Sequence, residues 1–264
     1  MDKNILNQID DLKSKLAGLR PLSKSAVRRL TDDFIIENTY NTNAIEGSSL
    51  TLRETYLILK DGFTVGGKLV REHLEAVGHR DAFYYMMNIV DNKAALTERI
   101  IKEIHALILV NDPQAKGRYR YEHVGIRGAR NPLTLPHLIP EEMEKLMADY
   151  ATMKQKKHVI EAIAEFHLRF EGIHPFIDGN GRTGRLIINF ELMKAGLLPI
   201  DIKFTDRDRY YRAFDAYYGD DKSPGPMTEI IANYELEELT KYVEMVEYAN
   251  AMEARENAKT PSVS

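Results

Sequence analysis

The chain has 264 residues, of which 44% are hydrophobic and 29% are charged. This composition excludes collagen-like chains and favours a folded protein over a largely disordered one. The absence of cysteine excludes disulfides, thiolate metal ligands and cysteine nucleophiles. A formal net charge of −4 gives no sign of bulk nucleic-acid binding. No stretch reaches the roughly 18 uncharged apolar residues of a membrane helix, and the N-terminus lacks a signal-peptide core. We therefore expect a cytoplasmic protein with no membrane or nucleic-acid partner.

Most of the chain shows the three- and four-residue apolar spacing of amphipathic helices. The first helix is predicted from Ile5 to Leu19, and Pro21 ends it. Two helices are predicted to begin at start signals, one at the capping box Thr51–Glu54 and one after the N-cap Thr97. Further helices are predicted over about 24–46, 68–92, 141–154, 158–172, 182–195, 206–218 and 227–256. His105 and His167 fall on apolar faces of these helices and are predicted to be packed residues rather than metal ligands. The pattern predicts an all-α protein.

Residues 113–140 break this pattern. Tyr119, Tyr121, Val124 and Ile126 alternate in the manner of a strand, and the glycine and prolines that follow exclude a long helix. We predict a short hairpin or an extended loop here.

The segment richest in chemistry is His174–Arg185, with the sequence HPFIDGNGRTGR. Its glycines match the G-x-G-x-x-G dinucleotide fingerprint, but that fingerprint requires a preceding strand within a βαβ unit. The preceding residues, 159–173, have helical periodicity, and no alternation of strands and helices surrounds them. A dinucleotide-binding fold is therefore disfavoured.

The same segment has the features of an anion site at a helix N-terminus. Gly179, Asn180 and Gly181 allow the backbone to turn sharply and to direct its N–H groups inward, just before a helix predicted to begin near Arg182. Arg182 and Arg185 are three residues apart and provide two guanidinium groups suited to phosphate oxygens. Asp178 could hold Mg²⁺ between phosphates, and His174 could act as a base. The segment therefore predicts a phosphate-transfer site.

This segment resembles the Fic family motif HPFx(D/E)GNGRxxR at every defined position. Gly117–Arg120, with Val124 and Ile126, resembles the family's target-docking flap. Residues 42–47 resemble its inhibitory motif (S/T)xxxE(G/N). The resemblance covers about residues 32–240. It implies the all-α Fic fold with a small β-hairpin flap, and transfer of AMP from ATP to a hydroxyl of a target protein or of the chain itself.

The resemblance also implies residue roles. His174 would deprotonate the target hydroxyl, and Asp178 would bind Mg²⁺. Glu46, with Thr42, would block productive ATP binding through Arg185. The ATP-binding set would be Gly179, Asn180, Gly181, Arg182, Thr183, Gly184, Arg185, Tyr210 and Tyr211, in which the first three form the anion hole and the tyrosines contact adenosine. Phe176 would anchor the loop in the core.

The expected organisation has three parts. Residues 1–94 form N-terminal helices that include an inhibitory helix at about 32–47, residues 95–240 form the catalytic core, and residues 241–264 form a C-terminal helix and tail. Two alternatives to AMP transfer stay open. One is removal of AMP at the same site, with Glu46 positioning water, and the other is a non-catalytic interaction module. The intact base, carboxylate and arginine pair argue against the module. A homodimer is a further possibility.

Overall fold

The computed structural model describes residues 3–125, 133–219 and 222–259. Within these ranges the chain is helical and contains no strand, which confirms the predicted all-α class. The helices are α1 (Lys3–Ala17), α2 (Lys24–Ile45), α3 (Leu52–Lys60), α4 (Val70–Asp91), α5 (Glu98–Ile108), α6 (Ile139–Lys156), α7 (Val159–Ile173), α8 (Asn180–Lys194), α9 (Arg207–Tyr218) and α10 (Gly225–Lys259), with 3₁₀ turns at Pro136–Leu138 and Phe204–Asp206.

Several helix starts follow the predicted capping residues. The Thr51 hydroxyl accepts a bond from the Glu54 backbone N–H (3.2 Å), and the Glu54 carboxylate accepts one from the Thr51 N–H (2.8 Å), which completes the capping box of α3. Thr97 caps α5 through the Ile100 N–H (3.2 Å). Helix α8 begins at Asn180, two residues before the predicted start, so the glycine turn leads directly into it.

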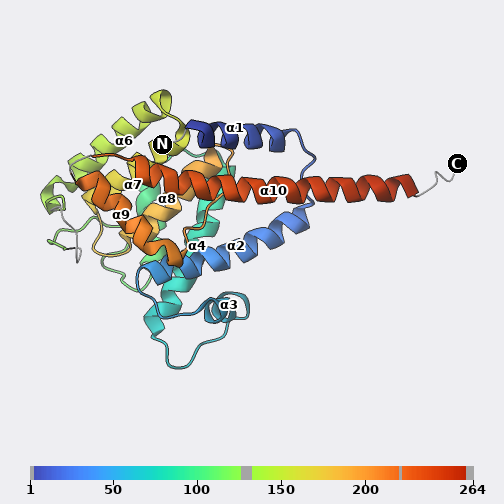
Figure 1. Ribbon diagram of the computed structural model, residues 1–264. Coiled ribbons are helices and arrows are strands. Elements are labelled where there is room, and N and C mark those ends of the chain that lie inside the picture. Colours follow the sequence, from blue (N-terminus) through green and yellow to red (C-terminus); the bar gives the residue numbers. More distant parts are fainter. Residues whose placement is uncertain (1–2, 126–132, 220–221, 260–264) are drawn as a thin grey trace.

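Helices α7 and α8 form the centre of the molecule, with α4, α5, α6 and α10 packed around them (Figure 1). One apolar cluster runs from Leu6 in α1 to Leu239 in α10 and includes residues of both central helices. The predicted N-terminal and catalytic parts therefore share a core, and their boundary stays a prediction. Helix α1 lies along α10, which projects beyond the rest of the molecule.

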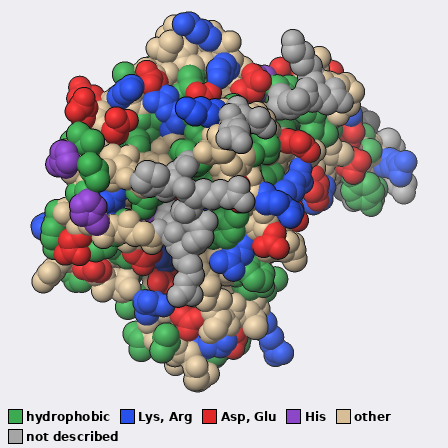
Figure 2. Space-filling view, turned by 60° about the vertical axis from the view of Figure 1, so that its left-hand side comes forward, with side chains coloured by type: hydrophobic (Ala, Val, Ile, Leu, Met, Phe, Trp, Pro, Cys, Tyr) green, Lys and Arg blue, Asp and Glu red, His purple; other side chains and the backbone are tan. Residues whose placement is uncertain are grey.

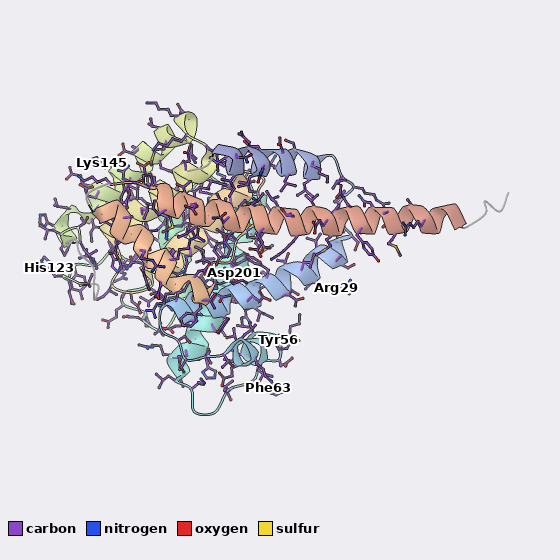
Figure 3. The ribbon with its side chains drawn as sticks, in the orientation of Figure 1. Arg29, Tyr56, Phe63, His123, Lys145 and Asp201 are labelled. Atoms are coloured by element: carbon purple, nitrogen blue, oxygen red, sulfur yellow. The ribbon has the colours of Figure 1, made fainter. Side chains whose placement is uncertain are left out.

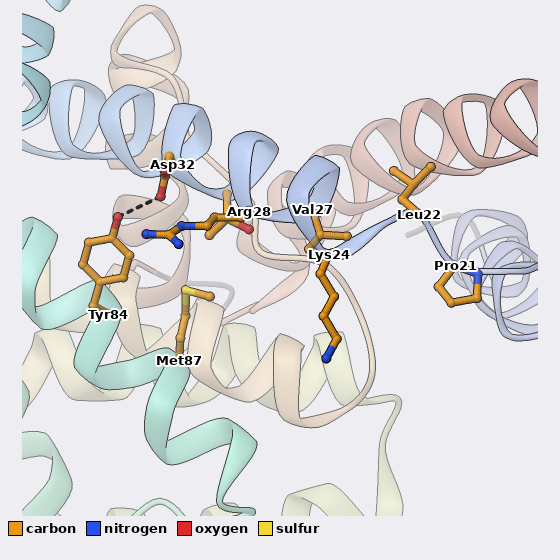
Figure 4. A pocket seen from close by; sticks show the side chains of 9 residues that line it. Pro21, Leu22, Lys24, Val27, Arg28, Asp32, Tyr84 and Met87 are labelled. Carbon is orange, nitrogen blue, oxygen red and sulfur yellow. Dashed lines mark hydrogen bonds between the residues drawn. The ribbon is translucent and has the colours of Figure 1, made fainter.

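The surface has charges of both signs. On the face shown in Figure 2, basic and acidic side chains are interspersed. A groove of about 490 Å³ opens between the start of α2 and α4 (Figure 4), and none of the motif residues lines it. Among the described helices, none is long and apolar enough to cross a lipid bilayer.

The predicted hairpin lies only partly within the described residues. Residues 118–125 are described and contain no strand, whereas Ile126 lies outside the described residues. Arg120 is buried and anchors this segment. Its guanidinium donates to the backbone carbonyls of His174 (2.8 Å), Glu122 (2.9 Å) and Thr134 (2.5 Å), and its N–H donates to that of Pro175 (2.9 Å).

Candidate active site

The motif loop joins α7 to α8 and is closed by its own hydrogen bonds. The Asn180 side chain accepts from the Phe176 N–H and donates to the Phe176 carbonyl, both at 2.9 Å. Phe176 is fully buried, as predicted for a residue that anchors the loop. Gly179 has φ 77°, a left-handed conformation that glycine adopts without strain, and it forms the N-cap of the 15-residue helix α8. The positive end of the α8 dipole therefore faces this loop.

A buried histidine supports the loop from α5. The His105 ring stacks on Phe176, with ring centroids 3.7 Å apart. Its Nδ1 accepts from the Gly117 N–H, so its Nε2–H donates to the Asp178 carbonyl, each at 2.9 Å. Burial lowers the pKa of His105 to about 4, which keeps the ring in the neutral form that both bonds require. The sequence predicted its burial but gave no signal of its hydrogen bonds.

The predicted base, His174, is the C-cap of α7 and adopts a left-handed conformation (φ 50°, ψ 60°). Such a conformation costs free energy for a residue with a Cβ, so its surroundings must hold it there. The bond from Arg120 to its carbonyl provides one restraint. The ring Nδ1 lies 3.6 Å from the Glu171 carboxylate, one turn earlier on α7.

Asp178 fits the predicted role of a magnesium ligand. One oxygen accepts from the Gly179 N–H (2.6 Å) and lies 3.4 Å from Arg182 Nη2, and the side chain is 58% exposed. In the described part of the chain, no three histidine, aspartate or glutamate side chains cluster as a metal site. A single accessible carboxylate suits Mg²⁺, which usually takes few protein ligands and completes its shell with phosphate and water.

Arg182 is buried between two carboxylates. Its guanidinium lies 3.4 Å from Asp178 and 3.5 Å from Glu75 on α4. Burial raises the pKa of the Glu75 carboxyl, and the positive charge of Arg182 opposes this shift. Glu75 was not identified from the sequence, because nothing near it in the chain marks a glutamate of α4 as a neighbour of the motif.

Arg185 is bound by the end of α2, almost 140 residues earlier in the chain. It donates to the Thr42 hydroxyl (2.8 Å), to the Thr42 carbonyl (3.1 Å) and to the Glu46 carboxylate (2.7 Å). The Arg185 side chain is 7% exposed and that of Glu46 is 36% exposed. The three residues predicted to form the inhibitory contact therefore do meet.

The Glu46 carboxylate also covers the glycine turn. A Cβ placed on Gly181 would lie 2.2 Å from Glu46 Oε1 and 3.1 Å from Arg185 Nη1. Only a glycine leaves room there for the carboxylate, which occupies the space directly beside the predicted anion hole.

The other predicted ATP-binding residues differ in exposure: Thr183, Gly184 and Tyr210 face the core, whereas Tyr211 is partly exposed. Thr183 is fully buried, and a Cβ on Gly184 would lie 2.7 Å from the His167 ring, so both residues face the core. Tyr210 is buried, and its hydroxyl lies 2.7 Å from His167 Nε2 and accepts from Arg185 Nη1 (3.4 Å). Tyr211 is half-exposed, with its hydroxyl 3.4 Å from the Ile45 carbonyl at the end of α2. An adenosine contact by either tyrosine stays a prediction.

Comparison with known proteins points to one family. Residues 95–192 match the model of the Fic/DOC family. The chain is 35% identical over 228 residues to a protein adenylyltransferase Fic of Nematostella vectensis, and the aligned region covers 83% of this chain and 52% of that protein. It is 30% identical to protein adenylyltransferase fic-1 of Caenorhabditis briggsae over 92% of this chain and 48% of that protein. The chain thus spans about half the length of these curated relatives.

Solved structures show the same likeness. A Fic-domain signalling protein from Bacteroides thetaiotaomicron superposes with a TM-score of 0.82 at 28% identity, covering 91% of this chain and 98% of that one. Fic-1 from C. elegans superposes with a TM-score of 0.81 at 28% identity, covering 94% of this chain and 73% of that one.

Proposed function

Since the chain belongs to the Fic/DOC family, we propose that it is a protein adenylyltransferase that transfers AMP from ATP to a hydroxyl side chain. The observation that carries the proposal is the closed loop His174–Asn180, with the N-terminus of α8 and the guanidinium groups of Arg182 and Arg185 beside it. This arrangement collects a base, a carboxylate and three sources of positive potential within the twelve residues His174–Arg185.

In the proposed reaction, the target hydroxyl attacks the α-phosphorus of ATP. The new oxygen–phosphorus bond forms as the bond to the β-phosphate breaks, and pyrophosphate leaves. His174 accepts the hydroxyl proton, which makes the oxygen a competent nucleophile. Arg182 and Arg185 bind the leaving phosphates, and the α8 N-terminus stabilises the charge on the α-phosphate. Asp178 would hold Mg²⁺, which neutralises phosphate charge.

We further propose that the enzyme is inhibited by its own Glu46. The guanidinium of Arg185 cannot offer the same N–H groups to a carboxylate and to a γ-phosphate. With Glu46 bound at 2.7 Å, ATP is held in a pose that does not present its α-phosphorus to the target hydroxyl. Removal of AMP from a modified protein is a second candidate, because the partly exposed Glu46 carboxylate beside Gly181 could orient a water molecule.

The experiment that tests the proposal uses ATP labelled at either the α- or the γ-phosphorus. Wild-type and Glu46→Gly protein are incubated with each nucleotide and a cell lysate, and the labelled proteins are identified. Above the label found in lysate without added protein, where endogenous kinases use the γ-phosphate, we expect further label only from the α-position, most strongly with Glu46→Gly, and none with Glu46→Gly/His174→Ala. Label from the γ-position that depends on the added protein would identify a kinase instead. Loss of label from an isolated, modified target on addition of wild-type protein would favour AMP removal.

A further inference from the structure

The contact between Glu46 and Arg185 depends on the register of two helices, α2 and α8. The segment between α8 and α9 binds both of them. On the α8 side, Asn189 donates to the Ile200 carbonyl (3.0 Å) and accepts from the Ile200 N–H (2.8 Å). Asn189 is buried and lies one turn after Arg185. These two bonds fix the segment to the helix that carries the phosphate-binding arginines.

On the α2 side, the next residue, Asp201, binds the helix through its carboxylate. One oxygen of its buried carboxylate accepts from Asn38 Nδ2 (3.2 Å), and the other accepts from Asn41 Nδ2 (2.7 Å) and from Lys203 Nζ (2.7 Å). The Asn41 amide oxygen in turn accepts from the Phe204 N–H (3.0 Å). Figure 3 shows Asp201 beside α2.

The spacing along each helix aligns these bonds with the inhibitory contact. Asn38, Thr42 and Glu46 are successively four residues apart and share one face of α2. Arg185 and Asn189 are also four residues apart, on one face of α8. The bond from Asn38 to Asp201 therefore lies one turn from Thr42 and two turns from Glu46 on α2, and the bond from Asn41 lies directly beside Thr42. On α8, the Ile200 bonds lie one turn from Arg185.

We propose that Asp201 is the positioning residue of the inhibitory helix: its carboxylate fixes α2 in the register that brings Glu46 to Arg185. The effect of Asp201 on AMP transfer rests on the proposed inhibition by Glu46. A buried carboxylate requires its donors, because its desolvation is offset only by hydrogen bonds and a nearby cation. If α2 shifted or rotated, Asn38 and Asn41 would leave and Asp201 would keep only Lys203. Because Asp201 needs these donors, the observed position of α2 is strongly favoured over shifted positions that apolar packing alone would tolerate.

The test combines Asp201→Asn with and without Glu46→Gly and measures incorporation of AMP from α-labelled ATP. Because the substitution places an NH₂ group against the donors of α2, we expect transfer to rise by about 3- to 10-fold, as for loss of one or two net hydrogen bonds. In the Glu46→Gly background it should change less than twofold, because the inhibitory contact is already absent. A substitution that merely destabilised the fold would lower transfer in both backgrounds. Glu37→Gln is the matched control, since Glu37 binds Lys203 from the solvent side and is 53% exposed, and it should leave transfer unchanged.

A second measurement does not depend on enzyme activity. Amide hydrogen exchange over residues 38–46 should become at least tenfold faster in Asp201→Asn, while the amides of α5 keep their rates. Asn41→Ala should act in the same way and replaces Asp201→Asn if that variant fails to fold. Unchanged exchange over 38–46 overturns the proposal. Faster exchange without a gain in transfer, although Glu46→Gly itself gains, also overturns the role in positioning Glu46. If Glu46→Gly gives no gain, the proposed inhibition fails, and hydrogen exchange alone decides the role of Asp201.

Discussion

Replacing Glu46 by glycine should activate AMP transfer by an amount that the ion pair sets. The Glu46 carboxylate accepts from Arg185 at 2.7 Å, and Arg185 is almost completely buried. A hydrogen bond between charged groups contributes about 1.5–3 kcal/mol, which corresponds to roughly 10- to 150-fold in the fraction of productively bound ATP. Because the Glu46 side chain is itself 36% exposed, water weakens the pair, and we expect the lower part of this range, about 10- to 30-fold.

The same substitution should have a small effect on folding. Glu46 is the C-cap of α2, outside the regular helix, and Arg185 keeps its two bonds to Thr42. The assay therefore measures two quantities for each variant, label incorporation from α-labelled ATP and the midpoint of thermal unfolding. We expect a midpoint within a few degrees of wild type together with the rise in transfer.

Two controls separate inhibition from packing. Glu46→Gln keeps the size of the side chain and one acceptor oxygen but removes the charge, and should give an intermediate gain. Adding Arg185→Ala to Glu46→Gly should abolish the gain, since the γ-phosphate loses its cation. An inhibitory role of Glu46 is refuted if Glu46→Gly lowers the unfolding midpoint and leaves transfer unchanged, because Glu46 would then act only in packing.

Three further predictions address the base, the metal ligand and the buried histidines. His174→Ala should leave ATP binding intact and reduce transfer about a hundredfold or more, and transfer near the parent rate would exclude His174 as the base. Asp178→Ala should weaken magnesium-dependent nucleotide binding by calorimetry, as EDTA should with the parent protein, and metal-independent binding would contradict this role. Burial lowers the pKa of His79 and His167 to about 3 and of His105 to about 4. Below about pH 6.5 the unfolded chain therefore binds more protons than the native one, and the free energy of unfolding decreases as the pH is lowered. Glu235, with its pKa raised by burial to about 8, opposes this trend, as do Glu75, Asp201 and Glu238, whose pKa values burial also raises. The three histidines and Glu235 alone give a loss on the order of 3 kcal/mol in urea unfolding between pH 7 and pH 5, and the other carboxyls reduce it. A flat profile would contradict it.

The sequence predicted features that short-range patterns specify. Thr51 and Thr97 cap helices because their side chains reach an N–H three residues away, and the same locality makes the glycine turn at the start of α8 predictable. The inhibitory contact was predicted only through the family resemblance, since Glu46 and Arg185 are 139 residues apart.

The remaining contacts depend on how distant helices pack. Glu75 lies on a helix whose sequence indicates nothing about Arg182, and Asp201 lies between two isoleucines in a connection whose sequence indicates nothing about α2. Its partners on α2 are about 160 residues away, and no periodicity relates them. Asparagine in a predicted helix would ordinarily be taken as exposed, so the burial of Asn38 and Asn41 gave no advance signal.

The Arg120 guanidinium has a consequence for how the proposed AMP transferase could change its target protein. It binds the carbonyls of Glu122 and Thr134, the two ends of the segment that includes the predicted docking residues, and also that of His174. One buried guanidinium thus holds the described ends of this segment, Glu122 and Thr134, together with His174. Closing a flexible loop of twice the length costs only about 0.6 kcal/mol more in chain entropy. If the proposed AMP transfer holds, insertions and substitutions between these ends can therefore change the docking segment at little cost in chain entropy while the predicted base keeps its place.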